Sequence, residues 1–198
     1  MSKVSVLTLL FLFASQDGVA SQTGTHEAGT SLRLRLDATQ ATFPRADMVT
    51  LRVLIENGQP GCATRFLDRV ISADPSPKRS LSHVELEIVD AGGKKVSRGT
   101  HSEPNWASMN ERSLMRLDCW ESFGRVVALA STEWGYRLPA GRYRVRARMT
   151  VKLREFFVQR PSLAKASAEW ARMKPEAFLN ALTDEVLESN EVEFEVRP

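Results

Sequence analysis

The sequence predicts a mainly β protein, an antiparallel β-sandwich with an α-helical hairpin inserted before its last strand. Two observations predict it. From residue 31 onward, apolar and polar residues alternate with a period of two, and short turns rich in glycine and proline separate the alternating segments. The period changes only in the late part of the chain, at about residues 155–188, where apolar residues recur at three-to-four spacing.

The alternating segments are expected to be strands: residues 31–37, 48–56, 83–90, 113–117, 123–130, 142–152 and 191–197. Residues 94–97 fit a hairpin partner for the strand before them, and residues 64–71 fit either a short strand or a helical turn. Helices are expected at 162–173 and 175–188, where Pro175 suits the first helical turn because its missing N–H is not needed there. Many short strands with regular turns are typical of a sandwich.

The first twenty residues predict a signal peptide. Lys3 precedes an apolar run of eleven residues at 4–14, and Gly18 and Ala20 are small enough for a signal peptidase site. Eleven helical residues rise about 16 Å, which is too short for a hydrocarbon core of about 30 Å. We therefore expect export to the periplasm or the cell exterior, a disordered leader at 21–30 and one domain at 31–198. The alternative is a buried first strand or helix.

The net charge argues against nucleic acid as a partner, and the two cysteines suggest an oxidising compartment. The net charge of +3 is shared between 27 basic and 24 acidic residues, which is too small an excess to indicate nucleic acid. No segment after residue 20 is apolar enough to span a membrane. Cys62 and Cys119 form an even pair, which predicts one disulfide in an oxidising compartment, with two unpaired thiols as the alternative.

Four arginines alternate along residues 142–148 and present one charged face. The functional interpretation is a basic ladder for phosphate or an acidic polymer. The structural interpretation is that Glu191, Glu193 and Glu195, which alternate in the same way, lie opposite this face on a neighbouring antiparallel strand. We favour the second, because opposed charges on a sheet contribute roughly 0.2–1 kcal/mol each and help to set the register.

A sharp turn at residues 138–143 carries the most specific architectural signal. Pro139 and Gly141 form the turn, and Tyr143 enters the next strand, so its hydroxyl can return to the backbone as in the tyrosine corner of Greek-key sandwiches.

Several framework segments resemble a recurrent pattern in exported bacterial immunoglobulin-like domains. These segments are residues 122–129, 134–136, 138–145 and 189–196, with 47–57 and 89–96 similar in order and spacing. The intracellular proteinase inhibitor family and the pro-regions of some fungal metalloendopeptidases are similar in the later segments. The resemblance covers about two-thirds of residues 31–198 and implies an immunoglobulin-like framework. Residues 98–121 and 153–188 depart from it, and no functional residue of a family can be placed on the chain.

The sequence lacks the common catalytic signatures. It has no paired-histidine helix, no Gly-x-Ser-x-Gly, no glycine-rich phosphate loop and no Cys-x-x-Cys. We expect no enzyme activity, no cofactor and no metal. The alternative is a metal-binding protein or enzyme built on His101 and Glu103, which are two ligands in an irregular loop.

Aromatic residues outside the framework supply the candidate partner surface: Trp106, Trp120, Phe156, Phe157, Trp170 and Phe178. Clustered apolar bulk of this kind either forms a partner site or packs on the sheet and covers its edge. The sequence therefore predicts a non-enzymatic exported binding or accessory module with a protein partner. A secreted protease inhibitor is the alternative that the resemblance implies.

Overall fold

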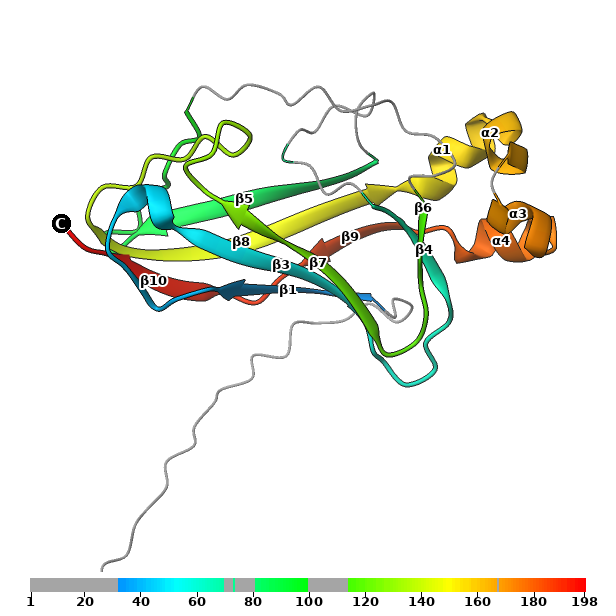
Figure 1. The fold of residues 1–198 in the computed structure, drawn as a ribbon, viewed down its shortest axis with the longest axis horizontal. Helices are drawn as coiled ribbons and strands as arrows, with labels where there is room; N and C mark the ends of the chain where they lie inside the picture. Colours follow the sequence, from blue (N-terminus) through cyan, green and yellow to red (C-terminus); the bar gives the residue numbers. More distant parts are fainter. Residues whose placement is uncertain (1–31, 70–72, 74–80, 100–113, 167) are drawn as a thin grey trace, which may run out of the picture.

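The computed structural model describes residues 32–69, 73, 81–99, 114–166 and 168–198 (Figure 1). The predicted signal peptide and leader lie outside these residues, as do His101, Glu103 and Trp106. Strands dominate the described part and pair almost entirely antiparallel, so the prediction of a mainly β protein is confirmed. Figure 1 shows the long strands running along the length of the molecule, with the short α-helices gathered at one end.

The first sheet has the strand order β1-β3-β7, with both pairs antiparallel. Its strands are β1 (Leu32–Ala38), β3 (Thr50–Asn57) and β7 (Glu121–Ala128). Alternation in the sequence sets the register: Leu34 lies opposite Ile55 and Leu36 opposite Val53, all four buried. A shift of one residue would turn this apolar set toward solvent.

The second sheet has the order β2-β10-β8-β5, and β9 pairs with the far half of β8. Its strands are β2 (Thr42–Phe43), β5 (Ser82–Asp90), β8 (Gly141–Lys152), β9 (Asp184–Glu188) and β10 (Val192–Val196). The pair β2–β10 is parallel and the other pairs are antiparallel. As predicted, the Tyr143 hydroxyl returns to the backbone and donates to the carbonyl of Pro139 at 2.6 Å.

The buried apolar faces of the two sheets contribute to one hydrophobic core. Its largest fully buried side chains are Trp134, Phe43, Phe66, Phe157, Phe178, Leu32, Leu36, Leu51, Ile55, Leu67 and Ile88. At the sheet margin, the Asn190 side chain makes the two hydrogen bonds that the backbone of a neighbouring strand would make. It accepts from the Leu36 N–H and donates to the Leu36 carbonyl, at 2.9 Å each. This exchange attaches the β9–β10 connection to β1.

The remaining elements lie beside the sandwich. They are the 3-10 helix η1 (Ala46–Met48), the antiparallel pair β4 (Arg65–Asp68) and β6 (Leu114–Leu117), and helices α1 (Leu153–Gln159), α2 (Pro161–Ala166), α3 (Ala168–Arg172) and α4 (Pro175–Ala181). The sequence allows either a short strand or a helical turn at residues 64–71, and residues 65–68 form a strand. The segment 94–97 returns along β5 through a bridge from Lys95 to Val89. The Asp90 N–H donates to the Lys94 carbonyl and the Val96 N–H to the Ile88 carbonyl, but the segment is too short to count as a strand.

The expected second helix at 175–188 is too long. Helix α4 ends at Ala181 and residues 184–188 form β9, so the helical part spans 153–181 instead of 155–188 and consists of four short helices. The reason is the length of β8. Along β8, strand β10 pairs only with residues 141–145, which leaves the second half of β8 open to another strand. Asp184 holds the start of β9 beside the start of α1, because its carboxylate accepts from the N–H groups of Arg154 (2.8 Å) and Glu155 (2.9 Å).

Candidate functional site

Glutamates on the neighbouring strands β10 and β5 balance the charge of the arginine face of β8. Arg144 lies opposite Glu193 and Arg142 opposite Glu195, as predicted. The closest ion pair on this face joins Arg146 to Glu191 at 3.0 Å. On the other flank, β5 places Glu85 opposite Arg148 and Glu87 opposite Arg146. The face is therefore a set of alternating charges with carboxylates on both sides, and it does not form a basic patch.

The aromatic residues of the helical segment mostly form core. Phe157 is 1% exposed and Phe178 is 0% exposed, so neither can touch a partner, and their placement on the partner surface is wrong. The Phe178 ring lies 5.4 Å from Phe66 and 5.4 Å from Trp170, and 6.1 Å from Phe157. These side chains pack the helices against β4. The packing stabilises the helices, because a short helix gains most of its stability from tertiary contacts.

Two other predicted aromatics in this segment are half-buried. Phe156 makes an edge contact with Phe157 at 5.3 Å and lies under the Arg160 guanidinium, 4.4 Å from the ring centroid. Trp170 packs on Phe178 and against the main core. Both are therefore used largely within the protein.

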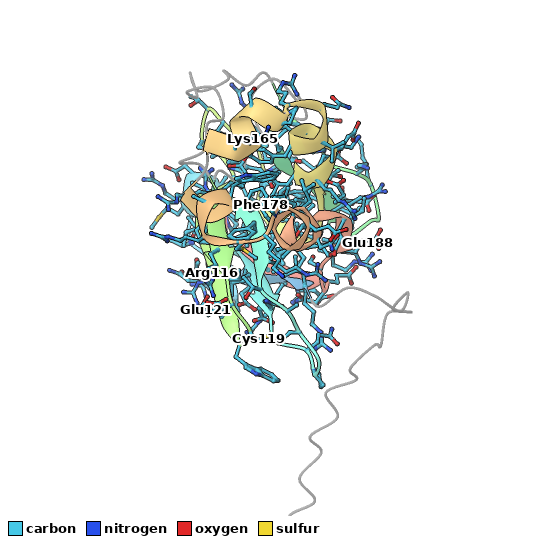
Figure 2. All side chains as sticks on the ribbon, turned by 90° about the vertical axis from the view of Figure 1, so that its right-hand side faces the viewer. Arg116, Cys119, Glu121, Lys165, Phe178 and Glu188 are labelled. Atoms are coloured by element: carbon cyan, nitrogen blue, oxygen red, sulfur yellow. A yellow bond between two sulfur atoms is a disulfide. The ribbon has the colours of Figure 1, made fainter. Side chains whose placement is uncertain are left out.

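The predicted disulfide is present. Cys62 and Cys119 are bonded, with their Cα atoms 5.7 Å apart, and they connect the turn after β3 to the turn between β6 and β7. Figure 2 shows Cys119, with Arg116 and Glu121, below Phe178 and Lys165 of the helical segment. We call residues 57–64 and 116–121 the disulfide loop pair.

Trp120, next to Cys119, is the most exposed large apolar side chain among the described residues, with 73% of its surface accessible. Its φ angle is +67°, the only positive value at a residue other than glycine in the described part of the chain. A left-handed backbone is a genuine outlier for a bulky residue. One side of its ring borders Gly58, where an added Cβ would lie 3.6 Å from the indole.

Asn57 is bonded to both segments of the disulfide loop pair. The sequence did not reveal this role, because Asn57-Gly58 indicates only the end of a strand. Asn57 is fully buried. Its side-chain N–H groups donate to the carbonyls of Ala63 (2.9 Å) and Leu117 (3.1 Å), and its backbone carbonyl accepts from the Trp120 N–H at 2.6 Å. The available sequence signal was an asparagine at a turn, which is too common to identify a buried organiser.

The polar groups around Trp120 are paired with one another. Thr64 donates to the carboxylate of Asp118 at 2.6 Å, and Arg116 donates to it at 2.9 Å. The Asp118 N–H in turn donates to Glu121 at 2.7 Å. The hydroxyl of Thr64 and then the Arg116 guanidinium hold the pKa of Asp118 below its usual value, because both stabilise the ionised carboxylate.

Two hollows lie elsewhere. One of about 220 Å³ is bordered by Arg98, Trp134 and Tyr136, where Arg98 is committed to three backbone carbonyls (Trp134, Ala73 and Glu133) and the Tyr136 hydroxyl donates to the Leu86 carbonyl at 2.8 Å. The other, of about 240 Å³, lies along β8 and β9 beside Glu185. Burial raises the pKa of Glu185, and the positive charge of Arg65 partly opposes this shift.

Among the residues that the structure describes, no three His, Cys, Asp or Glu side chains gather closely enough to hold a metal ion. In the same part of the chain, no helix combines the length and apolar character needed to span a membrane. The sequence matches no protein-family model. Comparison with curated protein sequences finds no significant match either.

Proposed function

We propose that this chain is an exported, non-enzymatic binding or accessory module with a protein partner, built on an immunoglobulin-like sandwich. The strand order supports the architecture: β1-β3-β7 forms one sheet and β2-β10-β8-β5 the other, with the parallel pair β2–β10 at the margin. The Tyr143–Pro139 hydrogen bond matches the tyrosine corner of such folds. The Cys62–Cys119 disulfide supports export, because disulfides persist mainly in oxidising compartments.

One observation carries the binding role: Trp120 is 73% exposed on a loop that the Cys62–Cys119 disulfide and the Asn57 hydrogen bonds hold in place. Tryptophan is among the residues most enriched at the energetic centres of protein interfaces, where a buried indole often contributes 2 kcal/mol or more, roughly a thirtyfold change in affinity. Charge does not suggest a competing surface, because the arginine face is already balanced by carboxylates.

The test is site-specific photocrosslinking in cells that export the chain. A benzoylphenylalanine replaces Ser122, which is exposed and two residues from Trp120, and a control chain carries it at Val158, which is 58% exposed in α1. We expect one protein to be trapped from position 122 and not from position 158. That protein, once purified, should bind the wild-type chain and bind Trp120→Ala roughly thirtyfold more weakly. Equal trapping from both positions, or unchanged affinity of the alanine variant, contradicts the proposal.

The trapped protein also decides between partner classes. If it is a protease that the chain inhibits, the module acts as the inhibitor that the framework resemblance implies. A non-catalytic envelope or secreted protein would indicate an accessory or assembly role.

A further inference from the structure

The backbone at Trp120 favours a different residue. Position 120 has a φ of +67°, a conformation that glycine adopts freely and that costs other residues roughly 1–2 kcal/mol. A buried indole would offset that cost by leaving water, yet this one stays 73% exposed. Within the fold, tryptophan is therefore a poor choice here, and strain of this kind persists only where the surroundings enforce it.

The surroundings do enforce it, through three independent restraints. The disulfide ties Cys119 to Cys62 on the facing turn. The Trp120 N–H is held by the Asn57 carbonyl at 2.6 Å, and Asn57 is itself fixed by its bonds to both segments. Thr64 then joins the facing turn to Asp118 at 2.6 Å. The indole is thus mounted on a loop pair that is crosslinked covalently and by hydrogen bonds.

The contact that the indole itself offers to a partner is apolar, and most of the charged side chains beside it are engaged within the protein. The side chains of Asp118, Glu121 and Arg116 are engaged in bonds within the loop pair. Gln59 is engaged as well, since its amide oxygen accepts from Arg33 when the amide is oriented toward that guanidinium. A sugar ligand would need several uncommitted polar groups beside the ring. An anionic membrane is recognised by clusters of uncommitted Lys and Arg, whereas Arg116 and Arg33 are bonded to Asp118 and Gln59.

We infer that the Cys62–Cys119 disulfide and the Asn57 hydrogen bonds hold Trp120 as a preformed anchor that inserts into an apolar pocket of the partner protein. This rests on the proposed function and adds the kind of contact and the source of its affinity. Restraint before binding raises affinity because less conformational freedom is lost on association.

The test is a double-mutant cycle against the protein trapped at position 122. The variants are Trp120→Ala, Cys62→Ala with Cys119→Ala, and all three together, with Val158→Ala as the surface control. Removing the disulfide should weaken binding about tenfold or more, and should make the Trp120 indole N–H mobile on the nanosecond scale by NMR relaxation. In the disulfide-free background, Trp120→Ala should then cost much less than in the wild type, because the anchor is already released.

The outcomes separate the two proposals. If the disulfide-free chain binds as well as the wild type, the preformed anchor is overturned and the binding role stands. Should Trp120→Ala bind normally in both backgrounds, both proposals fail. If the disulfide-free chain does not fold, Thr64→Val replaces it, since that change removes one restraint and keeps the disulfide; it must weaken binding at least twofold to support the anchor. Wild-type binding to phosphatidylglycerol vesicles that Trp120→Ala abolishes would overturn the protein pocket.

Discussion

The helical segment and the disulfide loop pair both carry aromatic residues that the sequence marks as a partner surface, and the structure treats them in opposite ways. Phe178 is completely buried in the helical segment, whereas Trp120 is 73% exposed on the loop. Phe178 lies inside helix α4 (Pro175–Ala181), and Trp120 lies in the left-handed region of the backbone.

The difference teaches that apolar bulk alone does not locate a binding surface. The helical aromatics are explained by what they pack against, namely Phe66, Phe157 and Trp170. Among the residues that the structure describes, no packing contact explains Trp120 in the same way, because its side chain is largely exposed and its backbone is strained. A residue that the fold does not need is the better candidate for contact with another molecule.

The largest expected loss of stability comes from changing the buried Phe178 of the helical segment. Phe178→Ala should lower the free energy of unfolding by about 3–5 kcal/mol, since it removes a fully buried ring between three aromatic neighbours. Urea denaturation measures this, with Val158→Ala as a control that should stay within about 0.5 kcal/mol of wild type. An unchanged midpoint for Phe178→Ala would mean that the helical segment is not part of the core.

The disulfide should contribute a comparable amount to global stability. It closes a separation of 57 residues, which corresponds to about 4 kcal/mol in the chain-entropy treatment. Replacing both cysteines with alanine should therefore lower the denaturation midpoint while the far-UV circular dichroism of the folded chain remains that of a β protein. Loss of all β signal under native conditions would show that the sandwich, and not only the loop pair, depends on this bond.

A smaller effect is expected at Glu185, where burial raises the pKa in the folded protein above the ordinary 4.5. A raised pKa means that the folded state holds the proton more tightly, so stability is greatest below the unfolded pKa and declines as pH rises through the folded value. Glu185→Gln should remove this decline, gaining less than about 1 kcal/mol near pH 7 and nothing near pH 4. Glu188→Gln, on the exposed face of the same strand, is the control. Equal stability of wild type and Glu185→Gln near pH 7 would contradict the assignment.

Much of the sandwich could be predicted from the sequence, because period-two alternation and turn residues are local signals. The opposition of Arg144 and Glu193 followed from matching alternation in two strands, and the Tyr143 bond from one turn. Strand β9 could not be predicted in this way. Residues 184–188 carry helix-compatible spacing, and only the unpaired length of β8 makes them a strand.

The candidate site was predicted less completely. Pairing of Cys62 with Cys119 follows from an even cysteine count, provided that the chain reaches the oxidising compartment that its first twenty residues predict. The exposure of Trp120 and the burial of Phe178 do not follow, because both are large apolar residues outside the framework, and only tertiary packing distinguishes them. The role of Asn57 depends on carbonyls six and sixty residues away, which no local pattern encodes.

The stability of Trp120→Gly against wild type, measured by chemical denaturation, tests most directly whether the indole serves the fold or another molecule. Glycine relieves the left-handed strain at φ +67°, so the variant should be as stable as the wild type or more stable by up to about 1 kcal/mol. Trp120→Ala, which keeps the Cβ and hence the strain, should be less stable than the glycine variant. A loss of more than about 1 kcal/mol in Trp120→Gly would show that the indole stabilises the protein itself, and would contradict its assignment as a partner contact.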